Sequence, residues 1–151
     1  MDRADRAEYL FGSILLLSNK FQIWGDNLIP ELTLKQWFLL ILISKMDAQA
    51  PTVKEVADFS GTSRQNVKKL LEHLESEGFV RLSRSKTDAR AWSVALTPRT
   101  FAYFSENAKM GANAVSGLFE KISDSELDSA ISVADRLLSA LEETKNEKFK
   151  N

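Results

Sequence analysis

The chain of 151 residues contains no cysteine, which removes several kinds of chemistry at once. It excludes disulfide bonds, metal sites built on thiolates, and sensing of peroxide through a reactive thiol. The first ten residues, MDRADRAEYL, mix acidic and basic side chains and lack the pattern of a signal peptide. We therefore expect a protein of a reducing compartment, with a cytoplasmic location.

Long apolar runs and catalytic motifs are also missing. The longest apolar run, Trp37 to Ile43, is far shorter than the roughly 20 residues that a membrane span needs. There is no glycine-rich phosphate loop, no HExxH and no GxSxG, so we expect no enzymatic activity and no cofactor. The single histidine, His73, lies between Glu72 and Glu75, and we expect it to be exposed to solvent rather than bound to a metal.

What the chain does contain is a segment from Thr52 to Thr97 that predicts two short helices. Thr52 and Glu55 have the spacing of a capping box, and Val56, Ala57 and Phe59 follow as a small apolar face. Ser63 is suited to cap a second helix, which has one apolar stripe and ends near Gly78. The stripe consists of Val67, Leu70, Leu71 and Leu74.

After Gly78 the periodicity changes from helical to alternating. Apolar and polar residues alternate over 80–85 and again over 92–96, on both sides of a basic loop, which predicts a β-hairpin. We therefore expect a mainly α fold with a small β wing, in which a winged helix–turn–helix over 52–97 is flanked by N- and C-terminal helices.

The net charge of −1 is unevenly distributed. Residues 52–99 hold nine Lys or Arg against six Asp or Glu, a balance of +3, and the remaining residues have a balance of −4. A positive centre within an acidic frame concentrates an attractive field for nucleic acid on the winged segment.

The winged segment resembles the MarR-type transcription regulators. Their wing carries an Asp-x-Arg pair followed shortly by Leu-Thr, here Asp88-Ala89-Arg90 and then Leu96-Thr97. Residues 55–57, 63–65 and 78–80 also look like that family's pattern. The resemblance implies a homodimer that binds an inverted-repeat operator, acts as a repressor or other regulator, and responds to a small-molecule effector.

Helices are expected on both sides of the winged segment. The predicted helices cover about 4–28, about 34–46, and two further stretches within 98–142, with Pro98 at the first position of one and Ser123 capping another. Phe101 and Phe104 begin the apolar face of the first of these. No repeat or interior linker is present, so 1–151 is interpreted as a single domain, with 4–28 and 98–142 as dimerisation helices.

The side chains suited to double-stranded DNA lie on the second short helix and in the wing. Arginine can pair with guanine, and glutamine or asparagine with adenine, whereas lysines and hydroxyls suit phosphates. The alternative is an ordinary solvated face, with Asp88 and Arg90 forming a surface ion pair. The candidates are Thr62, Ser63, Arg64, Gln65, Asn66, Lys68, Lys69, Arg84, Lys86, Asp88 and Arg90. Trp92 is expected to pack on the wing strand.

Two further sets of residues follow from the resemblance. The effector would bind near aromatic residues of a kind that more often belongs to the plain core: Phe21, Trp24, Trp37 and Phe38. The two-fold partner would be contacted by apolar residues that could equally be intramolecular: Leu10, Phe11, Ile122, Leu127, Ile131 and Leu138. The competing interpretation of the whole chain is a winged helix that binds another protein and has no DNA target of its own.

Overall fold

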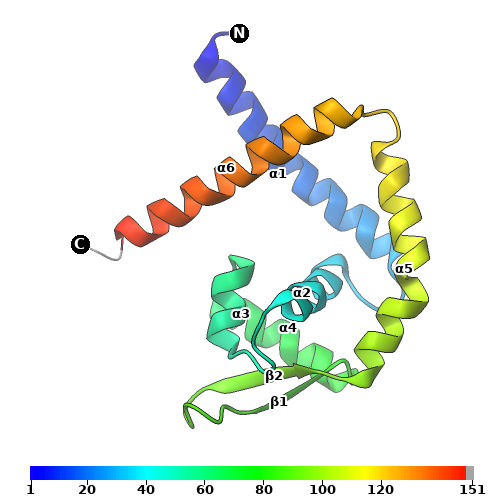
Figure 1. Cartoon of the computed structure of the whole chain (residues 1–151), viewed down its shortest axis with the longest axis vertical. Coiled ribbons are helices and arrows are strands. Elements are labelled where there is room, and N and C mark those ends of the chain that lie inside the picture. The colour runs from blue at the N-terminus through cyan, green and yellow to red at the C-terminus, as the bar shows by residue number, and fades with distance from the viewer. Residues whose placement is uncertain (149–151) are drawn as a thin grey trace. The chain divides into compact units, whose positions relative to one another are not determined.

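The computed structural model describes residues 1–148, which form six helices and one two-stranded antiparallel sheet. Their order along the chain is shown by colour in Figure 1. The elements are α1 (Arg3–Leu28), α2 (Leu34–Lys45), α3 (Val53–Ser60), α4 (Arg64–Ser76), β1 (Val80–Arg84), β2 (Trp92–Leu96), α5 (Pro98–Phe119) and α6 (Asp124–Lys148). The prediction of a mainly α fold with a small β wing is confirmed.

The chain separates into two compact units, Met1–Asn107 and Ala108–Asn151, and α5 contributes to both. The first unit holds the helix–turn–helix, the wing and every buried residue of the hydrophobic core. The second unit holds the end of α5 and all of α6. Across residues 1–148, no helix is both long and apolar enough to cross a membrane.

Helices α1 and α2 meet at a close contact between Gly25 and Leu34. A Cβ atom added to Gly25 would lie 2.7 Å from Leu34 Cδ1 and 2.8 Å from Leu34 Cβ, so only glycine allows this approach. The Thr33 hydroxyl then caps α2 by accepting from the Gln36 amide, while the Gln36 side chain accepts from the Thr33 amide. Helix α2 therefore begins where the sequence predicted it.

The core of the first unit lies where α2, α3, α4 and the sheet meet. The stripe predicted for α4 is buried at Val67, Leu71 and Leu74, which have no measurable exposure, while Leu70 is partly buried. In α3, Val56 and Ala57 are buried as expected. Phe59 is 55% exposed, so its assignment to the same apolar face was wrong. The reason is angular: two residues along a helix correspond to a rotation of about 200°, so the packing that buries Ala57 turns Phe59 towards solvent.

The wing joins this core at its base. Val80 pairs with Leu96, and the ladder continues to Arg84 opposite Trp92. The Val94 amide also donates to the Pro51 carbonyl, at 2.9 Å, and Thr52 forms a β-bridge with Ser93. The segment that leads into α3 thus lies against β2 like a short third strand, which explains why Ser93 is buried.

The first turn of α5 closes the end of α4. The Thr97 hydroxyl donates to the Gly78 carbonyl at 2.7 Å, and the Thr100 hydroxyl donates to the carbonyl of Phe79. Gly78, with φ of 80°, reverses the chain after α4 as predicted. Thr100 and Tyr103 form the buried face of α5, whereas Phe101, predicted only to lie on an apolar face of this helix, is 57% exposed.

Candidate nucleic-acid interface

The first turn of α4 carries polar side chains that are exposed to solvent, while the opposite face of the helix is buried in the core. The Ser63 hydroxyl accepts from the Asn66 amide at 3.2 Å, which caps the helix as the sequence predicted. Arg64, Gln65 and Asn66 are exposed, and Val67 directly after them is fully buried. Because the buried stripe fixes the rotation of α4, these three side chains all project from the domain.

The turn before α4 is tight. Gly61 adopts φ of 69° and ψ of 21°, the left-handed conformation that ends α3, and the Thr62 amide donates to the Ala57 carbonyl at 3.3 Å. No atom lies within 4 Å of a Cβ placed on Gly61, so the glycine is required by the backbone and not by crowding. The result is a helix–turn–helix with α4 as its second helix.

The tip of the wing, beyond the paired strands, is held by both backbone and side-chain hydrogen bonds. The Ser85 amide donates to the Ala91 carbonyl and the Ala91 amide to the Asp88 carbonyl, both at 2.9 Å. The Asp88 carboxylate accepts from the Arg90 amide at 2.9 Å, which closes a local turn. Ser85, buried within the tip, accepts from the amides of Thr87 and Asp88 through its hydroxyl. Asp88 therefore shapes the backbone of the tip. Among residues 1–148, the ion pairs do not include one between the side chains of Asp88 and Arg90.

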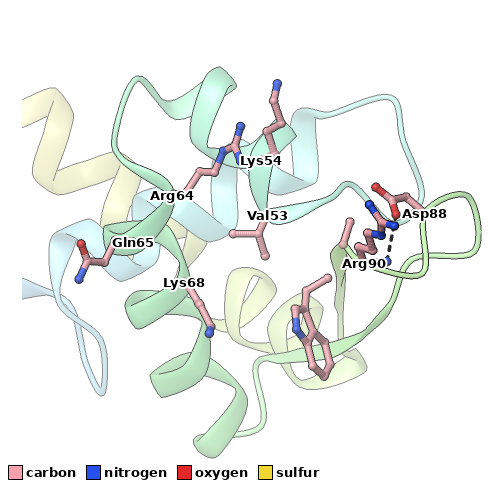
Figure 2. A pocket seen from close by; sticks show the side chains of 9 residues that line it. Val53, Lys54, Arg64, Gln65, Lys68, Asp88 and Arg90 are labelled. Atoms are coloured by element: carbon pink, nitrogen blue, oxygen red, sulfur yellow. Dashed lines mark hydrogen bonds between the residues drawn. The ribbon is translucent and has the colours of Figure 1, made fainter.

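A hollow of about 540 Å³ separates the first turn of α4 from the wing. Figure 2 shows Arg64 and Lys68 on one side of it and Asp88 and Arg90 on the other. Its described lining combines four cationic side chains with one carboxylate and an apolar floor: Val53, Lys54, Arg64, Gln65, Lys68, Asp88, Arg90, Ala91 and Trp92. The structure thus brings five of the predicted residues to one concave surface: Arg64, Gln65, Lys68, Asp88 and Arg90. The other predicted residues are not part of its described lining: Thr62, Ser63, Asn66, Lys69, Arg84 and Lys86.

Lys54 is the cationic residue of this described lining that the sequence did not indicate. It lies on α3, two residues after the capping residue Thr52, and local sequence gives no sign that it faces α4 and the wing. Only the packing of α3 against α4 and β2 places it there. Its ammonium forms an ion pair of 2.8 Å with Asp58, so the positive charge that Lys54 brings to the hollow is partly neutralised.

The other cations of the interface differ in how far they are already neutralised. Lys68 lies 3.6 Å from Glu72, one turn along α4. In the described residues, no ion pair involves Arg64, Lys69 or Arg90. These exposed charges are the ones most available to an anionic partner, because no carboxylate of the described residues has to be displaced from them.

Arg84, predicted to contact DNA, is engaged within the wing. Its guanidinium carbon lies 4.3 Å from the centre of the Trp92 ring, and its Nη1 donates a long hydrogen bond of 3.4 Å to the Arg90 carbonyl. Trp92 is 41% exposed and lies on the wing strand as expected, with this cation on its ring. Lys86 and His73 are exposed, the latter as predicted.

The aromatic residues predicted for an effector site are divided between core and surface. Trp37 is partly buried and packs on the hydrophobic core, whereas Phe38 beside it is 51% exposed. Phe21 and Trp24 are in edge-to-face contact, with ring centroids 6.5 Å apart. The structure therefore groups these four into two pairs, one on α1 and one on α2.

The residues predicted to contact a two-fold partner are exposed apolar side chains, apart from Leu127, which is partly buried. In the first unit, Leu10 is 44% and Phe11 65% exposed. In the second unit, Ile131 is 58% and Leu138 60% exposed, and Ile122 is 40% exposed. Apolar side chains with this much exposure, repeated along one helix, are typical of a surface that another protein covers.

Comparisons with known proteins agree with this fold. The model of the MarR family matches residues 31–91. The structure is similar to that of the transcriptional regulator BldR from Sulfolobus solfataricus, at 17% identity and a TM-score of 0.82, over 93% of this chain and 99% of that one. No sequence among curated proteins matches the chain.

Two further solved structures are relevant to the interface. A mutant of MarR from E. coli, complexed with operator DNA, is 18% identical with a TM-score of 0.77, over 91% of this chain and 99% of that one. BpsR from Bordetella bronchiseptica, in a structure concerning regulation of its DNA binding by 6-hydroxynicotinic acid, is 18% identical with a TM-score of 0.71, over 85% and 98%. At these identities the likeness establishes the fold.

Proposed function

From the premise that this chain belongs to the MarR family of DNA-binding transcriptional regulators, we propose that it binds an inverted-repeat operator as a homodimer. In this proposal a small-molecule effector modulates the affinity, and the protein acts as a repressor in the cytoplasm, where the operator is accessible. The fold and the family match support the DNA-binding part, and the residues described below support the details.

The single observation that carries the proposal is the shared concave surface of α4 and the wing. Arg64, Gln65 and Asn66 project from the first turn of α4, the part of a recognition helix that reaches base edges in the major groove. Arg90 projects from the wing across the hollow, where a guanidinium can enter a narrow minor groove. A DNA backbone between the two grooves would then pass the lysines of the hollow and of α4.

The phosphate contacts in this arrangement come from several elements. Lys68 and Lys69 lie one turn further along α4, Lys54 adds a cation from α3, and Lys86 adds one from the wing. Thr62 and Ser63 supply hydroxyls at the N-terminus of α4, where the helix dipole also favours a phosphate. Such contacts position the protein and do not by themselves specify a sequence.

The proposed inverted-repeat operator calls for a two-fold partner. Two recognition helices must reach half-sites about 34 Å apart, one helical turn of the duplex. The exposed apolar side chains of α1 in the first unit and of α6 in the second supply surfaces for such a partner. We propose that Leu10, Phe11, Ile122, Leu127, Ile131 and Leu138 contribute to it.

An effector is proposed to bind near the aromatic residues of α1 and α2. Phe21, Trp24, Trp37 and Phe38 are the candidates, since two of them are exposed and the others are only partly buried. The regulation of BpsR by 6-hydroxynicotinic acid is a property of that protein, and it supports an aromatic acid as the first class of compound to test here.

The experiment that tests the proposal is a fluorescence anisotropy titration of duplex DNA. Fragments from upstream of the protein's own coding sequence are compared with scrambled duplexes at two salt concentrations. Binding that depends on sequence and weakens with salt is the expected result, because phosphate contacts release counterions. Absence of binding at low salt would contradict the proposal and favour a winged helix that binds another protein.

A further inference from the structure

We infer that Arg84 is a positioning residue for Arg90 and does not itself contact a phosphate. The inference rests on the proposed DNA binding and concerns how the wing presents its arginine. It differs from the sequence-based expectation, which grouped Arg84 with the DNA contacts because of its charge alone.

The first observation is that both backbone polar groups of Arg90 are bonded to charged side chains of the wing. Its amide donates to the Asp88 carboxylate at 2.9 Å, and its carbonyl accepts from the Arg84 guanidinium at 3.4 Å. The strand pairing ends at Arg84 and Trp92, and Arg90 lies beyond it. There the backbone contributes two hydrogen bonds, from the Ser85 amide to the Ala91 carbonyl and from the Ala91 amide to the Asp88 carbonyl, both at 2.9 Å. The Asp88 and Arg84 side chains add to these bonds in holding the peptide planes on either side of Arg90.

The second observation is that the Arg84 guanidinium also stacks on Trp92. Its Cζ lies 4.3 Å from the ring centre, and the two residues are directly opposite each other on β1 and β2. Stacking on an indole restrains the orientation of the guanidinium plane. Because the guanidinium is planar, its N–H groups point outward at its edge and can still donate hydrogen bonds while its face lies on the ring. One side chain can therefore contact the Trp92 ring and the Arg90 carbonyl at the same time.

The third observation is the place of Arg84 relative to the hollow. Arg90, Ala91 and Trp92 all line it, whereas Arg84 is not part of its described lining. Arg84 thus touches the segment that forms the wall of the hollow without facing the hollow itself. Figure 2 shows the wall from inside, with Arg90 and Asp88 held together by the hydrogen bond between them.

The test is a double-mutant cycle between Arg84 and Arg90, measured as operator affinity over a range of salt concentrations. Arg84→Met is expected to weaken binding by about three- to ten-fold in the wild-type background, the range that loss of an exposed cation–π contact and a weak hydrogen bond implies. In the Arg90→Ala background the same change is expected to have less than about a twofold effect, since it acts through a side chain that is already absent.

The conservative variants separate positioning from charge. Arg84→Lys keeps the positive charge but not the planar fork, so it is expected to weaken binding about as much as Arg84→Met. Trp92→Phe keeps an aromatic face and is expected to bind like the wild type, whereas Trp92→Leu is expected to weaken binding. Arg81→Met is the matched control, because Arg81 is an exposed arginine on the same strand and lies on its other face.

Three results would overturn the inference. Additive losses in the cycle, with a further decrease of about 0.9 in the salt slope for Arg84→Met, would make Arg84 a phosphate contact in its own right. Unchanged affinity in Arg84→Met would show that the stacking of Arg84 on Trp92 has no role in DNA binding. Full rescue by Arg84→Lys would show that charge alone matters.

A measurement on the free protein separates this inference from the proposed function. The side-chain protons of Arg84 should show an upfield ring-current shift in NMR spectra, and Trp92→Leu should abolish it. If the shift is absent while the wild type binds its operator, the inference fails and the proposed function stands. If the shift is present and the wild type binds no duplex, the proposed function fails, and the role of Arg84 in DNA binding fails with it.

Discussion

The Tyr103 hydroxyl donates a hydrogen bond of 2.6 Å to the backbone carbonyl of Pro30. It links the buried face of α5 to the connection between α1 and α2. Four residues earlier on α5, Arg99 forms an ion pair of 2.7 Å with Glu31, and its guanidinium carbon lies 4.4 Å from the centre of the Phe79 ring. The start of α5 therefore joins the α1–α2 connection to the end of the recognition helix α4.

This contact predicts a dependence of stability on alkaline pH. Burial, with a smaller effect of the Glu31 charge, raises the pKa of Tyr103 from 10.0 to about 12. Because the folded pKa exceeds the unfolded one, its contribution to stability is complete below pH 10 and is lost as the pH rises to about 12. Tyr103→Phe should destabilise the protein by about 1 kcal/mol at neutral pH. Chemical denaturation of the wild type and of Tyr103→Phe at several pH values should show the difference in their free energies of unfolding shrinking or reversing above pH 10.

The close approach of α1 and α2 predicts the effect of a single methyl group. Gly25→Ala places a Cβ within 2.7 Å of the Leu34 side chain, and we expect a loss of about 1–3 kcal/mol in the free energy of unfolding. Gly12→Ala in the same helix is the control, because no described atom beyond its chain neighbours and the backbone of its own helix lies within 4 Å of a Cβ placed there. It should be neutral or stabilising by about 0.5–1 kcal/mol. Equal effects of the two changes would contradict the packing described.

The first turn of α4 is expected to read bases. Arg64→Ala or Gln65→Ala should reduce the preference for the operator over scrambled DNA by about 1–3 kcal/mol for each lost bidentate pair. Lys69→Ala should instead weaken binding to every duplex and decrease the salt slope by about 0.9. Competition binding with both DNAs distinguishes the two behaviours. A uniform loss for Arg64→Ala would reassign that residue to a phosphate.

Replacing Asp88 separates an effect of charge from an effect of wing geometry, because the two predict opposite changes in DNA affinity. If only charge mattered, removing a carboxylate from the interface would strengthen DNA binding. Because the Asp88 carboxylate accepts from the Arg90 amide, we expect Asp88→Ala to weaken binding instead, by no more than Arg90→Ala does. Asp88→Asn keeps an acceptor oxygen and should bind as well as the wild type or better. Tighter binding by Asp88→Ala would refute the role of the turn.

The exposed apolar face of α6 predicts the oligomeric state. The wild type should have a solution mass twice that of the 17.0 kDa chain. Ile131 and Leu138 are 58% and 60% exposed in the single chain. Combining Ile131→Glu with Leu138→Glu should give a monomer with much lower operator affinity. Phe59→Glu alters an equally exposed residue of α3 and should leave the mass unchanged. A dimeric double variant would place the partner surface elsewhere.

The local features of this chain could be predicted because each depends on residues close in sequence. The capping box of Thr52 with Glu55 forms as predicted. At Ser123 only half of the predicted box forms: the Glu126 carboxylate accepts from the Ser123 amide and hydroxyl, while the Glu126 amide donates to the Ser123 carbonyl and not to its hydroxyl. These hydrogen bonds lower the pKa of both glutamates. The left-handed conformation of Gly78 also follows from its immediate neighbours. The helix boundaries and the hairpin agree with the predictions for the same reason.

Some residues of the interface could not be predicted from local sequence. Arg64 and Gln65 could be proposed from their position after a cap, and Arg90 from its resemblance to a known wing. Lys54 could not, since its part in the hollow depends on how α3 packs against α4 and β2. The engagement of Arg84 with Trp92 likewise depends on the register of β1 and β2.

The sequence by itself determined the order of helices and strands, the caps, and the class of fold. These arise from hydrogen bonds and side-chain periodicity over a few residues. Only the tertiary structure decided which apolar side chains are buried: Phe59 and Phe101 are exposed, and Thr100 is buried because its hydroxyl bonds to the Phe79 carbonyl. It also decided that the positive charges of α3, α4 and the wing surround one hollow, because burial and juxtaposition depend on contacts between residues far apart in the chain.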